Sequence, residues 1–371
     1  MSNSNERQGP AAAHDEVIGP LGWTEGLARK FEPLSLRGFV PARVVAQHRG
    51  GYIVLSRYGE QTARVSGRLL HNSRDEGVMP AVGDWVAIAA PSGGATIINA
   101  VLPRTGKFSR GVAGERTEEQ VVAANVDLAM VVSSLDGDFN LRRIERYLAL
   151  AHAGAVEPVI VLSKADLADD IEDKRRAVES LAPGVAVEVI SNVTGAGVEG
   201  VRARLTAGVT VVVLGSSGVG KSTLINRLLG TDTQKTREVR KDGKGRHVTT
   251  HRELFSLPGG AVIIDTPGMR ELKLWEGDEE LSETFADIDE LAAQCRFRDC
   301  RHDSEPGCAI RAAIASGDLS GARFESYLKL QRESRSLEIR RDARAQSEER
   351  RKWRKVQRNY RAKVKFSGKK R

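Results

Sequence analysis

Short runs of apolar and β-branched residues, separated by turns rich in glycine and proline, recur along the first third of this chain. Between residues 36 and 104 they follow one another at roughly ten-residue spacing. They cover residues 41–45, 51–55, 61–65, 83–89 and 95–102. Five short strands at this spacing predict a small barrel, and we expect the OB type, whose exposed face commonly binds single-stranded RNA.

Basic and aromatic residues within these runs would give the barrel charged and stacking surfaces for RNA. They are Arg43, His48, Arg49, Tyr52, Arg57, Tyr58 and Arg64. The alternative is a barrel with an ordinary solvated face. Residues 1–35 are expected to form a partly disordered extension, with the disorder in 1–20, and residues 105–118 a basic, Gly-rich linker.

A second group of apolar runs leads into polar loops with chemical signatures. The run at 209–214 is rich in β-branched residues, and an amphipathic helical pattern with Leu224, Ile225 and Leu228 follows it. The loop between them, residues 215–222, fits G-x-x-x-x-G-K-[ST] in full. Strand, loop and helix in this order indicate a phosphate-binding loop, whose backbone N–H groups point at phosphates.

Lys221 of this loop would reach the β- and γ-phosphates, and Ser222 would ligate Mg²⁺. The predicted phosphate-binding residues are Gly215, Ser216, Ser217, Gly218, Val219, Gly220, Lys221, Ser222 and Thr223. Downstream lie a switch-like stretch at 245–250 and a strand over 260–265 that ends at Asp265 before Thr-Pro-Gly. Asp265 can hold Mg²⁺ through water, and Gly268 can meet the γ-phosphate.

The base-reading elements lie upstream of the phosphate loop. The strand at 159–162 ends in Ser163, Lys164, Ala165 and Asp166, an S-K-x-D sequence. A carboxylate at Asp166 can accept both the N1–H and the 2-amino proton of guanine, which adenine cannot offer together. A second strand at 185–190 ends in Ser191-Asn-Val-Thr-Gly, in the position of the loop that meets the guanine carbonyl.

All three cysteines of the chain lie within one short segment. Cys295, Cys300, His302 and Cys308 form C-x4-C-x-H-x5-C. Three thiolates and one imidazole complete a tetrahedral zinc shell with no open position, which predicts one structural zinc ion. An odd number of cysteines argues against a disulfide framework, and the charged residues around the cluster suit a metal-stabilised fold. Unliganded cysteines in a small helical domain are the alternative.

The chain of 371 residues is 40% hydrophobic, which suggests two or three domains with real cores. Residues 1–16 are polar and lack the apolar run of a signal peptide, and no stretch approaches the ~20 apolar residues of a membrane helix. We therefore expect a cytoplasmic protein without membrane contact.

Positive charge is concentrated in the last 41 residues. Residues 331–371 carry 17 Lys and Arg against 5 Asp and Glu, a net charge of +12, whereas the whole chain is +8. Residues 354–371 hold nine cations and no acid. Phe324, Tyr327, Leu328 and Leu330 begin this segment as an amphipathic helix. Such a tail can neutralise phosphates, which makes it an RNA-binding candidate; a solvated helix is the alternative.

Along the chain, the two base-reading segments come first, the phosphate loop follows them, and the two switch segments come last. This is the order of a circularly permuted GTPase domain. Over about residues 34–330 the chain resembles the ribosome-small-subunit-dependent GTPases of the RsgA type. The resemblance implies a multidomain protein: a partly disordered extension (1–35), an OB-type barrel (36–104), a permuted α/β GTPase domain (105–275), a mostly helical zinc-binding domain (276–330) and a basic helix and tail (331–371). It implies GTP hydrolysis stimulated by the small ribosomal subunit during its late maturation, with GTP, GDP and ribosomal RNA as partners. We expect a monomer.

Two positions depart from the family pattern. Ser163 stands where the family usually has Asn, which braces the phosphate loop against the base loop, and a Ser reaches less far. Asn192 stands where the family usually has Ala, and we expect little effect because the contact there is a backbone N–H. Guanine selectivity should therefore rest mainly on Asp166.

Hydrolysis would proceed by in-line attack of water, with Mg²⁺ held by Ser222 and a switch threonine, Thr249 or Thr250. Met269 occupies the position of the water-orienting Gln of Ras-like proteins and cannot orient water. His247 in the first switch is the candidate catalytic group, since the family carries a His at the matching place, and His251 is a weaker one. His247 as a phosphate or RNA contact is the alternative. Two other functions stay open: an ATP-dependent enzyme, and an RNA-binding assembly factor with a slow nucleotide switch.

Overall fold

The structure is a computed structural model of the full chain. It describes residues 16–48, 50–76, 79–90, 94–111, 119–230, 252–265, 284–335 and 347. The chain divides into two compact units. The first comprises Met1–Gly111 and Glu118–Lys273, and the second Val112–Thr117 and Leu274–Arg371. No helix in the described ranges combines the length and apolar character that crossing a membrane requires.

The first unit begins with a short 3-10 helix, η1 (Gly19–Leu21), and helix α1 (Glu25–Ser35). Thr24 caps α1, because its side chain accepts a hydrogen bond from the Leu27 N–H at 3.3 Å. Ile18 is fully buried and Leu21 is 3% exposed. The expectation of disorder over 1–20 is therefore wrong for residues 16–20, since their apolar side chains pack into the unit; residues 1–15 lie outside the described part.

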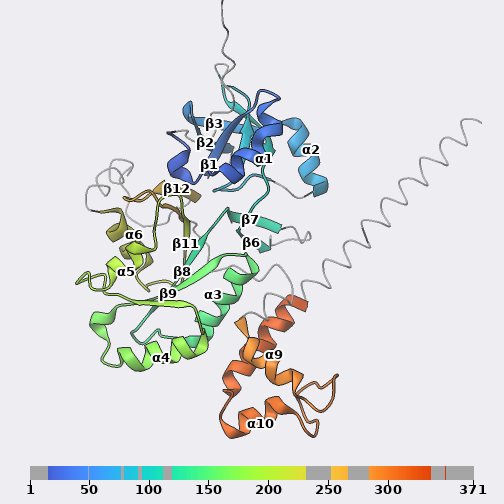
Figure 1. The fold of residues 1–371 in the computed structure, drawn as a ribbon, viewed down its shortest axis with the longest axis vertical. Coiled ribbons are helices and arrows are strands. Elements are labelled where there is room, and N and C mark those ends of the chain that lie inside the picture. The colour runs from blue at the N-terminus through green and yellow to red at the C-terminus, as the bar shows by residue number, and fades with distance from the viewer. Residues whose placement is uncertain are drawn as a thin grey trace, which may run out of the picture. The chain divides into compact units, whose positions relative to one another are not determined.

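The predicted barrel is confirmed, with every expected strand present (Figure 1). The barrel strands are β1 (Val40–His48), β2 (Gly51–Ser56), β3 (Gly59–Val65), β4 (Trp85–Ile88) and β5 (Thr96–Val101). Helix α2 (Gly67–Glu76) connects β3 to β4. Their order is β1-β2-β3-β5-β4, and β4 pairs with β1 to close the barrel. This connectivity, with β3 and β5 parallel, is that of an OB fold.

Two of the side chains expected to contact RNA are buried instead. Tyr52 is 6% exposed and packs in the barrel core with Val44, Val54 and Ile98. Arg43 is 1% exposed. Strand alternation places Tyr52 on the core face. Arg43 lies on the opposite face of β1 from Ala42 and Val44, and contacts with Leu21 and Thr210 bury it there. His48, Arg57, Tyr58 and Arg64 are exposed, whereas Arg49 lies outside the described residues.

The GTPase part is a parallel sheet extended by one antiparallel strand. Its strands are β8 (Leu128–Ser134), β9 (Glu157–Ser163), β10 (Ala186–Val189), β11 (Thr210–Leu214), β12 (Arg252–Ser256) and β13 (Val262–Asp265). Their order is β10-β9-β8-β11-β13-β12, and β12 is the antiparallel member. β8 and β11 are buried along their whole length, which explains their unbroken apolar runs.

Helices cover both faces of this sheet. They are α3 (Leu141–Ala153), α4 (Ile171–Leu181), α5 (Val198–Ala203) and α6 (Lys221–Leu229), with a 3-10 turn η2 (Ala165–Leu167) after β9. Val201 of α5 and Leu224 of α6 pack against Met130, Val161 and Val213 of the strands. α3 contacts β8 and β9, and α4 contacts β10. The sheet therefore carries the nucleotide loops on a core closed from both sides.

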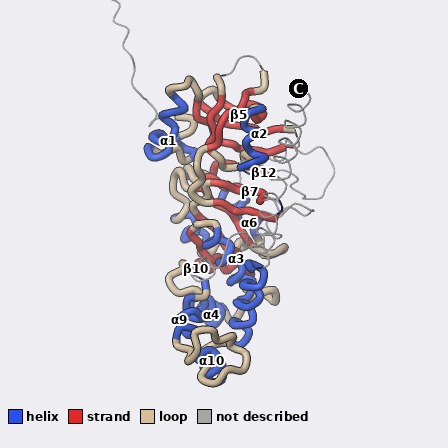
Figure 2. The backbone as a smooth tube through the Cα atoms, turned by 90° about the vertical axis from the view of Figure 1, so that its right-hand side faces the viewer, coloured by secondary structure: helices blue, strands red, loops and turns tan. Residues whose placement is uncertain are grey.

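The barrel and the GTPase sheet form one continuous sheet (Figure 2). β12 pairs antiparallel with β1, with Ala46 opposite Glu253 and Gln47 opposite Arg252. The expected linker at 105–118 also contributes structure. Residues 107–111 form strand β6 (Lys107–Gly111), which pairs with β7 (Glu119–Ala124). The basic, Gly-rich composition suggested a loop, but antiparallel pairing with the next strand along the chain overrides composition.

The second unit is helical in its described part, as predicted. It contains α9 (Ala286–Ala293), α10 (Ala309–Ser316) and helical residues 321–335. Phe285, Ile288, Ile310 and Leu330 are buried in it. The helix expected to begin near Phe324 starts at 321 and runs without a break across 330 and 331. The proposed boundary between zinc domain and tail therefore falls inside a helix.

Candidate guanine-nucleotide site and metal cluster

The nucleotide loops follow the carboxyl ends of neighbouring parallel strands. The phosphate loop follows β11, S-K-x-D ends β9, and the Ser191 loop follows β10. In a parallel sheet these ends lie at one edge, where open α/β sheets bind ligands. The structure therefore brings together three of the segments that the sequence marked, although they are up to about 60 residues apart along the chain.

The phosphate loop requires glycine where it leaves β11. Gly215 has a φ of +146°, and a Cβ atom there would lie 2.4 Å from the Val132 carbonyl oxygen. Lys221 begins α6 and folds back over the loop. Its Nζ donates to the carbonyl oxygens of Gly215 at 2.8 Å and Ser216 at 2.5 Å. The ammonium is thereby held over the phosphate loop, where its charge is expected to bind the phosphates.

Ser217, Gly218, Ser222 and Thr223 are exposed around this lysine. The hydroxyl of Ser222 lies in the first turn of α6, where the helix dipole and free N–H groups favour phosphate. The residues present therefore fit a nucleoside triphosphate with Mg²⁺ on Ser222.

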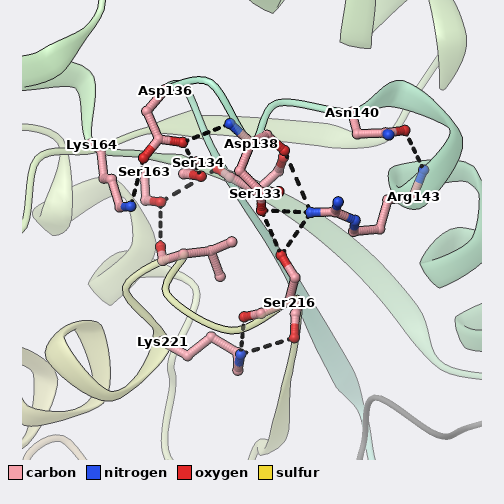
Figure 3. Close-up of polar contacts among 12 residues, drawn as sticks. Ser133, Ser134, Asp136, Asp138, Asn140, Arg143, Ser163, Lys164, Ser216 and Lys221 are labelled. Atoms are coloured by element: carbon pink, nitrogen blue, oxygen red, sulfur yellow. Dashed lines mark hydrogen bonds and ion pairs between the residues drawn. The ribbon is translucent and has the colours of Figure 1, made fainter.

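Asp138 and Arg143 adjoin the phosphate loop, and sequence reasoning missed both (Figure 3). Arg143 Nη1 donates to Asp138 Oδ2 at 2.6 Å and to Ser216 Oγ at 2.8 Å. Ser216 Oγ in turn donates to Asp138 Oδ2 at 2.9 Å. The hydrogen bond from Arg143, and then that from Ser216, lowers the pKa of Asp138. No motif marks these residues; only their place after β8 at the same sheet edge could have indicated them.

The base-reading loops are joined to each other. Ser191 Oγ donates to Asp166 Oδ1 and accepts N–H bonds from Val193 at 3.2 Å and Thr194 at 3.1 Å. The Ala165 N–H donates to the Ile190 carbonyl at 3.1 Å. Asp166 is exposed, so a guanine base can approach the carboxylate that Ser191 orients.

Lys164 has a left-handed φ of +60°, and its Nζ donates to Asp136 Oδ2 at 2.7 Å (Figure 3). The hydrogen bond from Lys164, followed by that from Ser134, lowers the pKa of Asp136 to about 2. The side chain of Lys164 is thus held by the loop that follows β8, two residues before Asp166 in the sequence.

Ser163 and Asn192 both reach the phosphate loop. Ser163 is fully buried, and its Oγ donates to the Val219 carbonyl at 2.6 Å. Asn192 Nδ2 donates to the Gly220 carbonyl at 3.2 Å. Sequence reasoning assigned Asn192 only a backbone contact and so missed its side chain, because the register of its loop against the phosphate loop is a tertiary property.

Several predicted residues of the site lie outside the described residues. They are His247, Thr249, Thr250 and Gly268, together with His251 and Met269. Asp265 is the last residue of β13 and pairs with Glu253 of β12. The strand end that carries it therefore lies beside β11, at the same edge as the phosphate loop.

The four predicted zinc ligands converge. Their ligand atoms lie within 4.8 Å of one another. His302 Nδ1 is 3.6 Å from Cys295 Sγ and 3.5 Å from Cys308 Sγ, and the two sulfurs are 4.0 Å apart. A tetrahedral zinc ion with Zn–S bonds of about 2.3 Å needs ligand atoms about 3.5–3.8 Å apart. The cluster therefore fits a zinc ion.

The backbone around the cluster is fixed by hydrogen bonds. Glu305 accepts N–H bonds from Arg301, Asp303 and Ser304 at 3.0–3.1 Å. His302 between them has a left-handed φ of +62°, and its ring meets the edge of Phe324 with centroids 6.0 Å apart. The loop thus presents the imidazole to the thiols from a rigid turn.

Comparison with known proteins agrees with this site. The family model for the RsgA GTPase matches residues 101–275. A "Small ribosomal subunit biogenesis GTPase RsgA" of Opitutus terrae is 46% identical over 363 residues, which are 95% of this chain and 99% of that protein. A protein of the same name from Syntrophotalea carbinolica is 46% identical over 90% of this chain and 94% of its own length.

Two solved structures share the fold. YjeQ from Thermotoga maritima has a TM-score of 0.59 and 28% identity, covering 80% of this chain and 98% of that one. YloQ, described as a circularly permuted GTPase, has a TM-score of 0.56 and 27% identity, covering 80% of this chain and 96% of its own. With the permuted order of the nucleotide loops already visible in the sheet, this similarity shows that the chain belongs to the RsgA GTPase family and is a GTP hydrolase that works with Mg²⁺.

Proposed function

We propose that this GTPase binds the small ribosomal subunit in the cytoplasm, as a monomer, and assists the late stage of its assembly. The observation that supports this most is the reach of the similarity. Relatives named for small-subunit biogenesis match 95% and 90% of the chain, so the match extends beyond the nucleotide domain into its flanking parts. Membership of a GTPase family also argues against an ATP-dependent enzyme.

The barrel and the tail would hold ribosomal RNA. Arg57 and Tyr58 lie at the turn between β2 and β3, with the guanidinium 5.0 Å from the ring centroid, and Tyr58 is 47% exposed. A stacked cation and ring beside exposed His48 and Arg64 suit single-stranded RNA. The nine cations of 354–371 would add contacts to phosphate.

Hydrolysis would follow in-line attack of water on the γ-phosphate. Lys221 would stabilise the charge on the phosphates. Ser222 and Thr249 or Thr250 would hold Mg²⁺, with Asp265 acting through water. His247 would orient the attacking water once the subunit orders the first switch, because Met269 cannot. Without the subunit, the first switch would not be ordered and GTP hydrolysis would be slow. The alternative of a slow nucleotide switch therefore describes this same site without the subunit.

Cys295, Cys300, His302 and Cys308 would hold one structural zinc ion. In the permuted order the second switch directly precedes this part of the chain. A rearrangement of the switch on hydrolysis would therefore act on the metal-stabilised unit and help to release the subunit.

The proposal is tested by measuring the GTPase rate against added small subunits, large subunits and naked RNA. We expect small subunits to stimulate the rate and the other two additions to leave it unchanged. The Lys221→Ala variant, which should not hydrolyse GTP, measures the background rate. Equal stimulation by large subunits or by naked RNA would contradict the proposal.

A further inference from the structure

Two consecutive carbonyl groups of the phosphate loop are tethered to the two base-reading loops. The Val219 carbonyl accepts from Ser163 Oγ at 2.6 Å, and the Gly220 carbonyl accepts from Asn192 Nδ2 at 3.2 Å. Ser163 ends β9, and Asn192 follows β10. Lys221 comes directly after the two tethered residues, so these contacts set the position of the phosphate-binding lysine relative to the base.

Ser163 can supply only one of these tethers. A hydroxyl carries a single proton, whereas an amide NH₂ carries two. Ser163 Oγ lies 3.4 Å from the Ser133 carbonyl and 2.6 Å from that of Val219, and the shorter contact takes the proton. The Gly220 carbonyl is therefore left to another donor, and Asn192 is the side chain that reaches it.

The two side chains converge on Gly220. This residue has a φ of +94°, and a Cβ atom placed there would lie 3.0 Å from Asn192 Nδ2 and 3.9 Å from Ser163 Oγ. Arg227 of α6 holds the backbone of the Asn192 loop, since its Nε donates to the Asn192 carbonyl and its Nη2 to that of Val193, each at 3.0 Å. The amide is thus held in place before a nucleotide binds.

The other end of the same amide has no hydrogen-bond partner within the described part of the chain. Asn192 Oδ1 is buried and finds no hydrogen-bond donor among the residues that the structure describes. An unpaired buried carbonyl is destabilising, and an alanine would avoid that cost. The residue therefore has a structural disadvantage that its contact with the phosphate loop must offset.

We propose that Ser163 and Asn192 together brace the phosphate loop against the two base-reading loops. Asn192 is the positioning residue on which nucleotide affinity depends. The inference rests on the GTPase activity and is independent of the proposed ribosomal partner.

The test exchanges the amide between the two loops. Dissociation constants for GDP and a non-hydrolysable GTP analogue are measured by fluorescence, without ribosomal material, for Asn192→Ala, Ser163→Asn and the double variant. Asn192→Ala should weaken binding about tenfold, the effect of one lost hydrogen bond. Ser163→Asn alone should also weaken it, because two amides then crowd Gly220. The double variant should return to within about twofold of the wild type.

A second readout separates bracing from base reading. Inosine diphosphate lacks the 2-amino group, so the ratio of GDP to IDP affinity reports on Asp166. Asn192→Ala should leave this ratio unchanged, whereas Asp166→Asn should lower it. Asn99→Ala, in barrel strand β5, is the matched control and should bind nucleotide like the wild type.

Thermal unfolding of each variant without nucleotide identifies any folding defect. The inference is overturned if Asn192→Ala binds both nucleotides as tightly as the wild type, or if the losses of the two single variants simply add in the double variant. Absence of stimulation by small subunits would bear only on the proposed function, since this assay contains none.

Discussion

The orientation of the Asp166 carboxylate is set by a hydrogen bond from the hydroxyl of Ser191. Ser191 Oγ accepts the N–H groups of Val193 and Thr194, so its only proton points to Asp166 Oδ1. Asp166 is exposed, so its other acceptor positions are open to a ligand. A guanine edge would offer two donors to such a group, and we therefore predict that Asp166 selects guanine.

Asp166→Asn should change the base preference from guanine to xanthine. The amide offers an N–H donor where the carboxylate offered acceptors, so GDP affinity should fall about 10- to 100-fold, as for a lost hydrogen bond to a charged group. Competition of GDP and XDP for the variant measures the change. Retained guanine preference would show that 163–166 does not read the base.

Asp136 should contribute pH-dependent stability through Lys164. Its pKa in the folded protein is about 2, mainly because Lys164 donates to it, and lies below the unfolded value of about 3.9. The unfolded chain therefore binds more protons in this range, so the contribution is fully present above about pH 5 and is lost as the pH falls toward 2.

Asp136→Asn should accordingly lower the free energy of unfolding at pH 6 by about 0.2–1 kcal/mol, the range for partly exposed pairs. Urea unfolding at pH 6 and pH 3 should show the gap to wild type shrinking at the lower pH. Asp173→Asn, whose carboxylate is 81% exposed in its pair with Arg176, is the control. A gap that stays constant with pH would contradict the assignment.

At the scale of elements, the loop that carries the four candidate zinc ligands has few buried apolar side chains of its own. The segment between α9 and α10 is stabilised by the carboxylate of Glu305 and the convergence of four ligands, and most of its side chains are exposed. Small loops of this kind gain folding free energy from the metal itself.

The protein should carry one zinc ion per chain, and Cys300→Ser or His302→Ala should lose it. Residues around 295–308 should then become sensitive to protease, while GDP binding persists because the nucleotide loops lie in the other unit. Elemental analysis measures the metal. Less than about a tenth of an equivalent on native protein would count against a structural zinc site.

Arg43 joins several elements of the first unit. Its guanidinium donates to the carbonyls of Leu21 and Gly83 and, at 2.7 Å, to Thr210 Oγ1 at the start of β11. It also lies 5.0 Å from the ring centroid of Trp85. Burial lowers its pKa to about 10, against the opposing effect of Asp127 and Asp84.

Arg43→Met should destabilise the protein by about 3 kcal/mol or more, because several buried acceptors lose their donor at once. Urea unfolding measures the loss, and Arg57→Met, on the exposed turn of the barrel, is the matched control. A loss no larger than that of the control would show that Arg43 is not the joint between barrel and GTPase sheet.

At the scale of the whole molecule, the pairing of β1 with β12 makes the barrel continuous with the GTPase sheet. β12 is the first described strand after the switch-like stretch at 245–250. A shift of β12 would therefore act on the barrel through backbone hydrogen bonds.

Deletion of 353–371 should weaken binding to small subunits and flatten its salt dependence, because the nine positive charges of 354–371 are removed with it. It should leave the basal GTPase rate unchanged. His247→Ala should do the reverse: binding with a non-hydrolysable GTP analogue persists, and the stimulated rate falls about 100-fold or more. A tail deletion that slows basal hydrolysis, together with a fully responsive His247 variant, would disprove this division of roles.

Much of the fold and the site follows from the sequence alone. The phosphate loop, S-K-x-D, the Ser191 loop, the Cys/His cluster and the barrel strands were all predictable. Each is a short segment in which the chemistry or the strand geometry requires particular residue types at fixed spacing. Such a pattern lies within one segment, so it can be recognised without knowing the tertiary structure. The permuted order is likewise a property of the linear chain, and together with the Cys/His cluster it indicates the family.

The tertiary structure decided the roles of single polar side chains. Tyr52 was expected on an RNA-binding surface but faces the barrel core, because strand register sets the face. Arg43 lies on the other face of its strand and is buried by contacts with Leu21 and Thr210. Asp138 and Arg143 belong to no predicted motif. They contact the phosphate loop, as the Asn192 side chain does, because β8, β10 and β11 end at one edge. Contacts between segments distant in sequence depend on how the strands are ordered in the sheet, and spacing along the chain does not encode them.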